Sequence, residues 1–162
     1  MIIELLPHFD AGDKAFWHGD QDERPLSLLG RSQAMDVAAS LMAGGEIDAL
    51  FSSPALRCYE SLAPLSDRLG IEVQVLDTLA EKGADEDLAE MIQRGLIAIE
   101  QIREELPEGR AVACSHGDII PATIDVLRGM YGISAPSLER RGQWYTIEFD
   151  GDEVSVQLRE AG

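Results

Sequence analysis

The sequence predicts an α/β domain with three layers, in which helices cover both faces of a largely parallel central sheet and a β-hairpin closes the C-terminal end. Short apolar runs alternate with stretches of helical periodicity over residues 1–130, a pattern typical of parallel strands joined by crossover helices. The segments 143–149 and 153–159 alternate as strands around Asp150-Gly151, a dipeptide typical of tight hairpins. No repeat or Gly/Ser linker interrupts the 162 residues, so we expect a single domain over 1–162.

The remaining elements follow from apolar spacing and from the residues that begin and end helices. Ser53 and Pro54 resemble an N-cap followed by proline at the first helical position, and Gly70 is a suitable helix stop. The polar stretch from Asp10 to Pro25 is longer than most loops, and such loops are often functional. The expected strands are 1–6, 48–52, 71–76 and 110–115, and the expected helices are 28–43, 54–69, 88–107 and 119–130.

Composition excludes several kinds of partner. The chain has 13 Lys+Arg against 30 Asp+Glu, a formal net charge of −17, which would repel a nucleic-acid backbone. No window approaches the roughly 18 apolar residues of a membrane span, and the N-terminal residues lack the basic region of a secretion signal. Two cysteines, Cys58 and Cys114, are too few for a disulfide framework. We therefore expect a cytoplasmic protein with no nucleic-acid or membrane partner.

Candidate site residues follow the predicted strands at one edge of the sheet. His8 follows the first strand, Arg57 the second, Glu81 the third and His116 the fourth. Because the carboxyl ends of parallel strands meet at the same edge, we expect these groups to converge there. By contrast, the loop residues His18, Asp20 and Asp22 have no known ligand spacing, so no metal site is expected.

These residue types suit phosphoryl transfer. A neutral imidazole is a competent nucleophile toward phosphorus, and a second, cationic imidazole can stabilise charge on the transferred group. Arg57, in the first turn of a predicted helix, can bind an anion together with the free N–H groups there. Glu81 is a possible donor of a proton to a leaving oxygen.

Four segments carry a resemblance to a known family. They are LLPHFDAG, ERPLSLLGRSQA, FSSPALRCYES and VACSHGDIIP. In order and spacing they resemble the motifs of the histidine phosphatase (phosphoglycerate mutase-like) superfamily, in its small phosphohistidine-phosphatase branch, over about residues 1–130. The resemblance implies a cofactor-independent phosphatase acting on a small phosphorylated substrate or a phosphohistidine protein.

The same resemblance implies a role for each site residue. His8 would become phosphorylated, His116 would complete the pocket, and Glu81 would be the proton donor. Arg24 and Arg57 would bind the phosphoryl group. No metal or organic cofactor is implied.

One departure from the family pattern affects the pocket. The arginine that precedes the nucleophile in the family is Pro7 here, and the small residue that follows it is Phe9. A lost charge-assisted contact is worth about 1.5–3 kcal/mol. Two alternatives therefore remain open: a weak or inactive phosphatase fold that binds a phosphorylated ligand or protein, and a flavodoxin-like binding module whose histidines are incidental.

Overall fold

The computed structural model describes all 162 residues around one six-stranded sheet. The strand order is β3-β2-β4-β1-β5-β6, in which the first four strands are parallel and the last two run antiparallel. The strands are β1 (Ile2–Pro7), β2 (Ala49–Ser52), β3 (Val73–Val75), β4 (Arg110–Ser115), β5 (Gln143–Asp150) and β6 (Glu153–Glu160).

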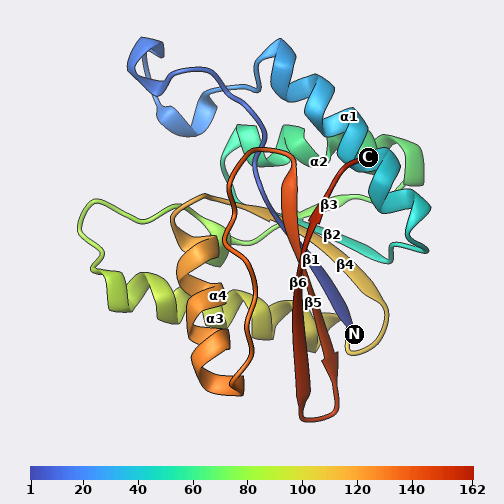
Figure 1. Cartoon of the computed structure of the whole chain (residues 1–162). Helices are drawn as coiled ribbons and strands as arrows, with labels where there is room; N and C mark the ends of the chain where they lie inside the picture. Colours follow the sequence, from blue (N-terminus) through green and yellow to red (C-terminus); the bar gives the residue numbers. More distant parts are fainter.

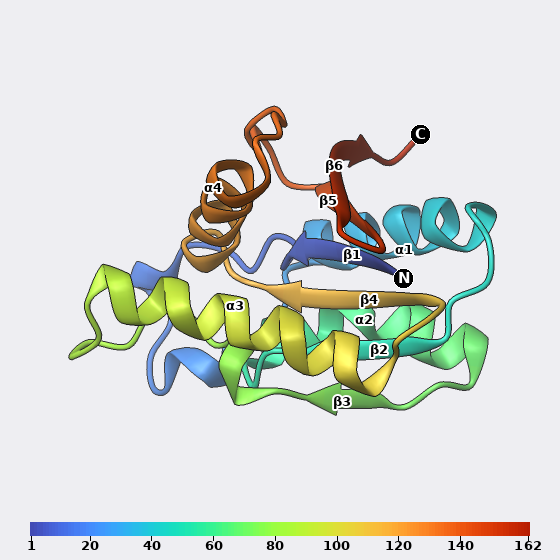
Figure 2. The ribbon, with the colours of Figure 1, turned by 90° about the horizontal axis from the view of Figure 1, so that it is seen from below.

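Four helices cover the two faces of the sheet. They are α1 (Leu28–Ala43), α2 (Leu56–Leu69), α3 (Leu88–Glu105) and α4 (Ile119–Tyr131). Helices α1 and α2 pack together on one face, and α3 and α4 pack on the other (Figures 1 and 2). The predicted three-layer α/β class with a C-terminal hairpin is therefore confirmed. None of the helices combines the length and the apolar character that a membrane crossing requires.

The parallel strands are buried on both sides, so their alternate side chains enter two separate hydrophobic clusters. Along β4, Ala111 and Ala113 join the cluster under α3 and α4, whereas Val112 and Cys114 join the cluster under α1 and α2. This is why β4 reads as a continuous apolar run in the sequence.

Pro7 occupies a position in β1 where a missing N–H is tolerated. It pairs with Ser115 of β4, but the pairing of β1 with β5 ends earlier, at Leu5. Proline is accepted at a strand end where no ladder bond is lost. The next residue restores the ladder, because the His8 N–H donates to the Ser115 carbonyl at 3.0 Å.

Two predicted boundaries were wrong. Helix α2 begins at Leu56 rather than at Pro54, and its N-cap Ala55 makes no side-chain capping bond. The hydroxyl of Ser53 instead accepts a bond from the Ala55 N–H at 3.2 Å in a tight turn. Strand β3 covers only Val73–Val75, because β2, its neighbour in the sheet, is itself only four residues long and pairs with it over three positions.

The long polar segment between β1 and α1 is partly structured. It contains two short 3-10 turns, Lys14–Phe16 and Gln21–Glu23, each capped by an aspartate side chain. Its start is fixed to α1, since Ser27 donates to the Asp10 carboxylate and the Ser27 N–H donates to the Asp10 carbonyl. The segment thereby brings Arg24 back to the end of β1.

Candidate active site

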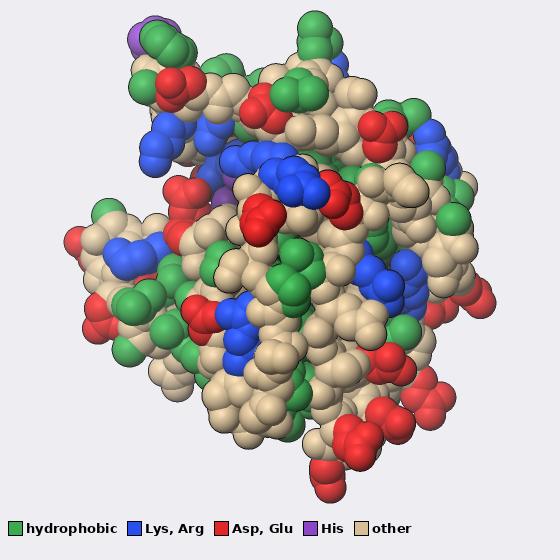
Figure 3. Space-filling model, viewed as in Figure 1, with side chains coloured by type: hydrophobic (Ala, Val, Ile, Leu, Met, Phe, Trp, Pro, Cys, Tyr) green, Lys and Arg blue, Asp and Glu red, His purple; other side chains and the backbone are tan.

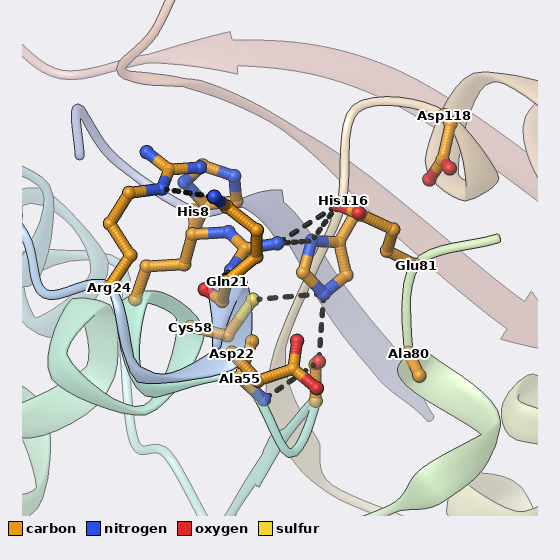
Figure 4. Close-up of polar contacts among 12 residues, drawn as sticks. His8, Gln21, Asp22, Arg24, Ala55, Cys58, Ala80, Glu81, His116 and Asp118 are labelled. Carbon is orange, nitrogen blue, oxygen red and sulfur yellow. Dashed lines mark hydrogen bonds and ion pairs between the residues drawn. The ribbon is translucent and has the colours of Figure 1, made fainter. Parts of the chain in front are cut away.

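The two predicted histidines face each other at the carboxyl end of the sheet. His8 follows β1 and His116 follows β4, which is the strand next to β1. Their ring centroids are 5.5 Å apart in an edge-on arrangement, and both side chains are buried. Figure 4 shows the two imidazoles close together, with Arg24 on the side of His8 and Glu81 beside His116.

The ring of His8 has a defined tautomer. Its Nδ1 lies 2.7 Å from the carbonyl oxygen of Phe9, and since a carbonyl only accepts, Nδ1 carries the proton. In the neutral ring, Nε2 then holds a free lone pair. Burial is the main cause that lowers the pKa of His8, to about 3, so the ring is neutral at physiological pH.

His116 is oriented by two neighbours. Its Nε2 lies 2.8 Å from the hydroxyl of Ser53, and its Nδ1 lies 3.4 Å from Nη2 of Arg57. Because a guanidinium only donates, the neutral ring accepts at Nδ1 and donates from Nε2 to Ser53. The carboxylate of Glu81 lies 3.5 Å from Nδ1 and would pair with the cationic ring.

Arg57 stands in the first turn of α2 and is almost completely buried. Its Nη1 donates to the Gln21 carbonyl at 2.8 Å, and its Nη2 donates to the Glu81 carboxylate at 2.9 Å. Its Nε is buried without a hydrogen-bond partner, and a buried donor left unpaired is costly. The backbone of Arg57 is held by Ser61, whose hydroxyl donates to its carbonyl at 2.7 Å.

The loop that carries Glu81 is fixed from the far face of the sheet. Arg94 of α3 donates to the carbonyls of Ala80 and Glu81, at 2.6 and 3.2 Å. Asp118, at the start of α4, accepts from the Lys82 N–H at 3.0 Å. The side chain of Glu81 is about half exposed (52%), so it lies at the outer side of the site.

Arg24 is buried beside the nucleophile candidate rather than facing solvent. Its Nη1 donates to the Ala11 carbonyl at 2.7 Å, and its Nε donates to the Gln21 side chain at 3.2 Å. Burial is the first cause that lowers the pKa of Arg24, and the positive charge of Arg57 is the second. The two guanidiniums therefore share one neighbourhood, as expected of two ligands for a single anion.

Sequence reasoning missed two groups of the site. Ser53 has a capping signature, which concealed its bond to His116. Arg141, just before β5, donates from Nη1 to the His8 carbonyl at 2.6 Å, and no motif of the sequence marks it. All five predicted residues, by contrast, lie at this edge of the sheet.

The structure offers no obvious place for a metal ion. No three His, Cys, Asp or Glu side chains are grouped so that they could hold one, and His18 is exposed in the loop before α1. The buried thiols Cys58 and Cys114 are free. The site is thus built from imidazoles, guanidiniums and one carboxylate.

A family comparison agrees with this arrangement. Residues 12–86 match the model of the histidine phosphatase superfamily, branch 1. The matched span contains two of the four motifs, ERPLSLLGRSQA and FSSPALRCYES, and the predicted resemblance to this superfamily is confirmed.

Several known proteins are similar to this chain in sequence or in structure. An 8-oxo-(d)GTP phosphatase of Mycolicibacterium smegmatis is 30% identical over 123 residues, which are 76% of this chain but only 36% of that protein. The structure of Bacillus stearothermophilus YhfR superposes with a TM-score of 0.80 at 19% identity, covering 96% of this chain and 94% of the other. The structure of the protein histidine phosphatase SixA complexed with tungstate superposes with a TM-score of 0.73 at 18% identity, covering 99% of this chain and 97% of the other.

Proposed function

We propose that the protein is a phosphatase that hydrolyses a phosphomonoester or a phosphohistidine through a covalent phosphohistidine on His8. The observation that carries the proposal is the state of His8: a neutral, buried imidazole whose Nδ1–H is bound to a carbonyl and whose Nε2 is free. Such a nitrogen is poised to attack phosphorus.

Two guanidiniums would hold the phosphoryl group during this attack. Arg24 has no carboxylate within 4.0 Å, and Arg57 has a buried Nε–H without a partner. Donors placed around the equatorial oxygens stabilise the charge of the transition state. His116, fixed by Ser53 through Nε2, would add a further donor from Nδ1 opposite His8 when the ring is in its cationic form.

The reaction would proceed in two displacements. In the first, Nε2 of His8 forms a bond to phosphorus, the bond from phosphorus to the leaving oxygen breaks, and the protonated Glu81 carboxyl transfers its proton to that oxygen. In the second, water attacks phosphorus, Glu81 takes the proton from the water, and the bond between phosphorus and His8 breaks to release phosphate. No cofactor is required for either step.

The substrate class we propose is a small phosphorylated molecule or a phosphohistidine protein. The relatives named above support a phosphate compound, since one is described as an 8-oxo-(d)GTP phosphatase and another as a protein histidine phosphatase. Because the chain has a net charge of −17, attraction for such an anion must come from local cationic groups such as these arginines.

The test is to trap the covalent intermediate. The protein is mixed with 4-nitrophenyl phosphate and quenched in base, and the intact mass is measured. A phosphoenzyme that survives base but is lost in acid is expected, and His8→Ala should abolish both it and turnover. His18→Ala serves as the matched control, because His18 is exposed and remote from the site. Undiminished hydrolysis by His8→Ala would refute the proposal, whereas phosphate binding without turnover would indicate a binding protein.

A further inference from the structure

The segment between α4 and β5 returns to the edge of the sheet where the site lies. In Figure 1 the orange chain after α4 rises along the molecule to the upper end of β1 before β5 begins. It delivers two neighbouring arginines, Arg140 and Arg141, to this edge. Figure 3 shows Lys and Arg side chains gathered around a hollow in which a histidine is visible, although the chain as a whole is acidic.

The two arginines have different partners on the two sides of β5. Arg140 forms a two-point ion pair with Glu160 of β6, with both bonds at 2.6 Å. The Nη1 of Arg141 instead donates to the carbonyl of His8, at the end of β1, at 2.6 Å. Gly142, with φ of +92°, takes a conformation that favours glycine in the turn directly before β5. The side chain of Gln143 accepts from the N–H groups of residues 139 and 140 and holds the segment in place.

Most of the hydrogen-bonding capacity of Arg141 is unused. A guanidinium has five N–H donors, and the bond to His8 is the only one that this side chain makes. No carboxylate lies within 4.0 Å of it, in a chain with 30 acidic residues. An arginine that is bound to the backbone of the nucleophile candidate and lacks an anionic partner has free donors for a ligand anion.

The charge of Arg141 also reaches the site. Burial is the largest cause that lowers the pKa of His8, and among the charged neighbours that add to it Arg141 ranks ahead of His116 and Arg57. Arg141 also helps to lower the pKa of Arg24, after burial and Arg57. Its guanidinium therefore belongs to the same electrostatic cluster.

We propose that Arg141 is a third phosphate-binding guanidinium, which approaches from the C-terminal hairpin and replaces the arginine that Pro7 cannot supply. The inference rests on the proposed function. Pro7 is the last residue of β1 and directly precedes His8. Arg141 contacts the backbone carbonyl of His8 itself. The cation thus reaches the same residue from a different part of the chain.

The experiment compares two adjacent arginines. Arg141→Ala should lower kcat/KM for 4-nitrophenyl phosphate ten- to a hundredfold and weaken the binding of inorganic phosphate and tungstate, measured by calorimetry, by a factor in the same range. Arg141→Lys keeps the charge but loses the planar fork of the guanidinium, so its kcat/KM and its phosphate affinity should lie between those of the parent and those of Arg141→Ala. Arg140→Ala is the matched control and should stay within twofold of the parent. The melting temperature of Arg141→Ala should match that of the parent, because the side chain is exposed.

The outcomes separate this inference from the proposed function. If the parent hydrolyses the aryl phosphate and Arg141→Ala behaves like Arg140→Ala in both assays, the role of Arg141 is overturned and the phosphatase stands. If the parent is inactive but binds phosphate, the proposed function fails, and the phosphate affinity of Arg141→Ala decides the inference alone. If the parent neither hydrolyses the aryl phosphate nor binds phosphate, both are wrong.

Discussion

The hydroxyl oxygen of Ser53 lies 2.8 Å from Nε2 of His116, and both side chains are almost completely buried. The same hydroxyl accepts from the Ala55 N–H, so the turn that leads into α2 also orients the imidazole. We expect Ser53→Ala to lower kcat/KM by about three- to tenfold, the range of one net hydrogen bond. Steady-state kinetics would measure this, with Ser66→Ala at the far end of α2 as a control. Equal kinetics in the two variants would contradict the orienting role of Ser53.

The lowered pKa of His8 makes a prediction about acid stability. Because the folded pKa, about 3, lies below the usual value near 6.5, the unfolded state binds the proton more tightly between these values. Stability should therefore fall as pH drops from about 6.5 toward 3, and the share due to His8 should be about 2–4 kcal/mol by pH 4. Urea unfolding of the parent and of His8→Asn at several pH values isolates this share. Parallel pH profiles for the two proteins would show that His8 is not buried as a neutral ring.

Arg24 is expected to contribute to binding of the phosphoryl group. Arg24→Ala should cost more than about 1.5 kcal/mol in kcat/KM, roughly tenfold or more. Because Arg24 also bonds the Ala11 and Gly12 carbonyls, thermal unfolding is measured alongside the kinetics. Arg31→Ala, an exposed arginine of α1, is the control. A kinetically silent Arg24→Ala would leave the predicted pair with one guanidinium and would favour a binding protein.

Glu81 is predicted to matter most when the leaving group is poor. Glu81→Gln keeps an acceptor for Arg57 but removes the transferable proton. It should slow hydrolysis of phenyl phosphate much more than that of 4-nitrophenyl phosphate, whose leaving group needs little protonation. Glu104→Gln, exposed on α3, controls for the loss of charge. The same reduction for both esters would assign Glu81 a role in holding Arg57 instead.

The glycine in the second motif is explained by a close approach. A Cβ at Gly30 would lie 2.0 Å from the carbonyl oxygen of Asp10, so α1 and the chain after His8 would have to separate. Gly30→Ala should lower the free energy of unfolding by about 1–3 kcal/mol. Gly129→Ala in α4, where a Cβ meets nothing within 4 Å, should instead be neutral or stabilising. Thermal unfolding of the two variants tests the contrast, and equal melting temperatures would contradict it.

Elements with strong local signals could be predicted from the sequence. The apolar spacing of α1 and the apolar run of β4 both reflect burial in the interior. The bounds predicted from them, 28–43 and 110–115, match the structure to within a residue. Since strand ends of a parallel sheet converge, the placement of His8 and His116 followed from the same pattern. The start of α2 was wrong by two residues, because Ser53 satisfies the Ala55 N–H in a turn rather than in a helical cap.

Arg141 could not be predicted, because its role depends on a contact across 133 residues of sequence. Nothing in the local pattern of residues 136–142 distinguishes it from Arg140, its neighbour. The two differ only in what surrounds them: Arg140 has Glu160 as a partner across the hairpin, and Arg141 has the end of β1. Long-range pairing of this kind comes from the assembled sheet.

The division of the interior into two hydrophobic clusters has a consequence for ligand-linked stability. The site joins the two halves: Arg57 stands on α2, whereas the loop of Glu81 is held by Arg94 of α3. An oxyanion bound there would act as a reversible cross-link between the layers, contributing about RT ln(1 + [L]/Kd) to the folded state. Amide hydrogen exchange should then slow in both helical layers when phosphate or tungstate is added, although neither ion would contact more than one edge of the sheet.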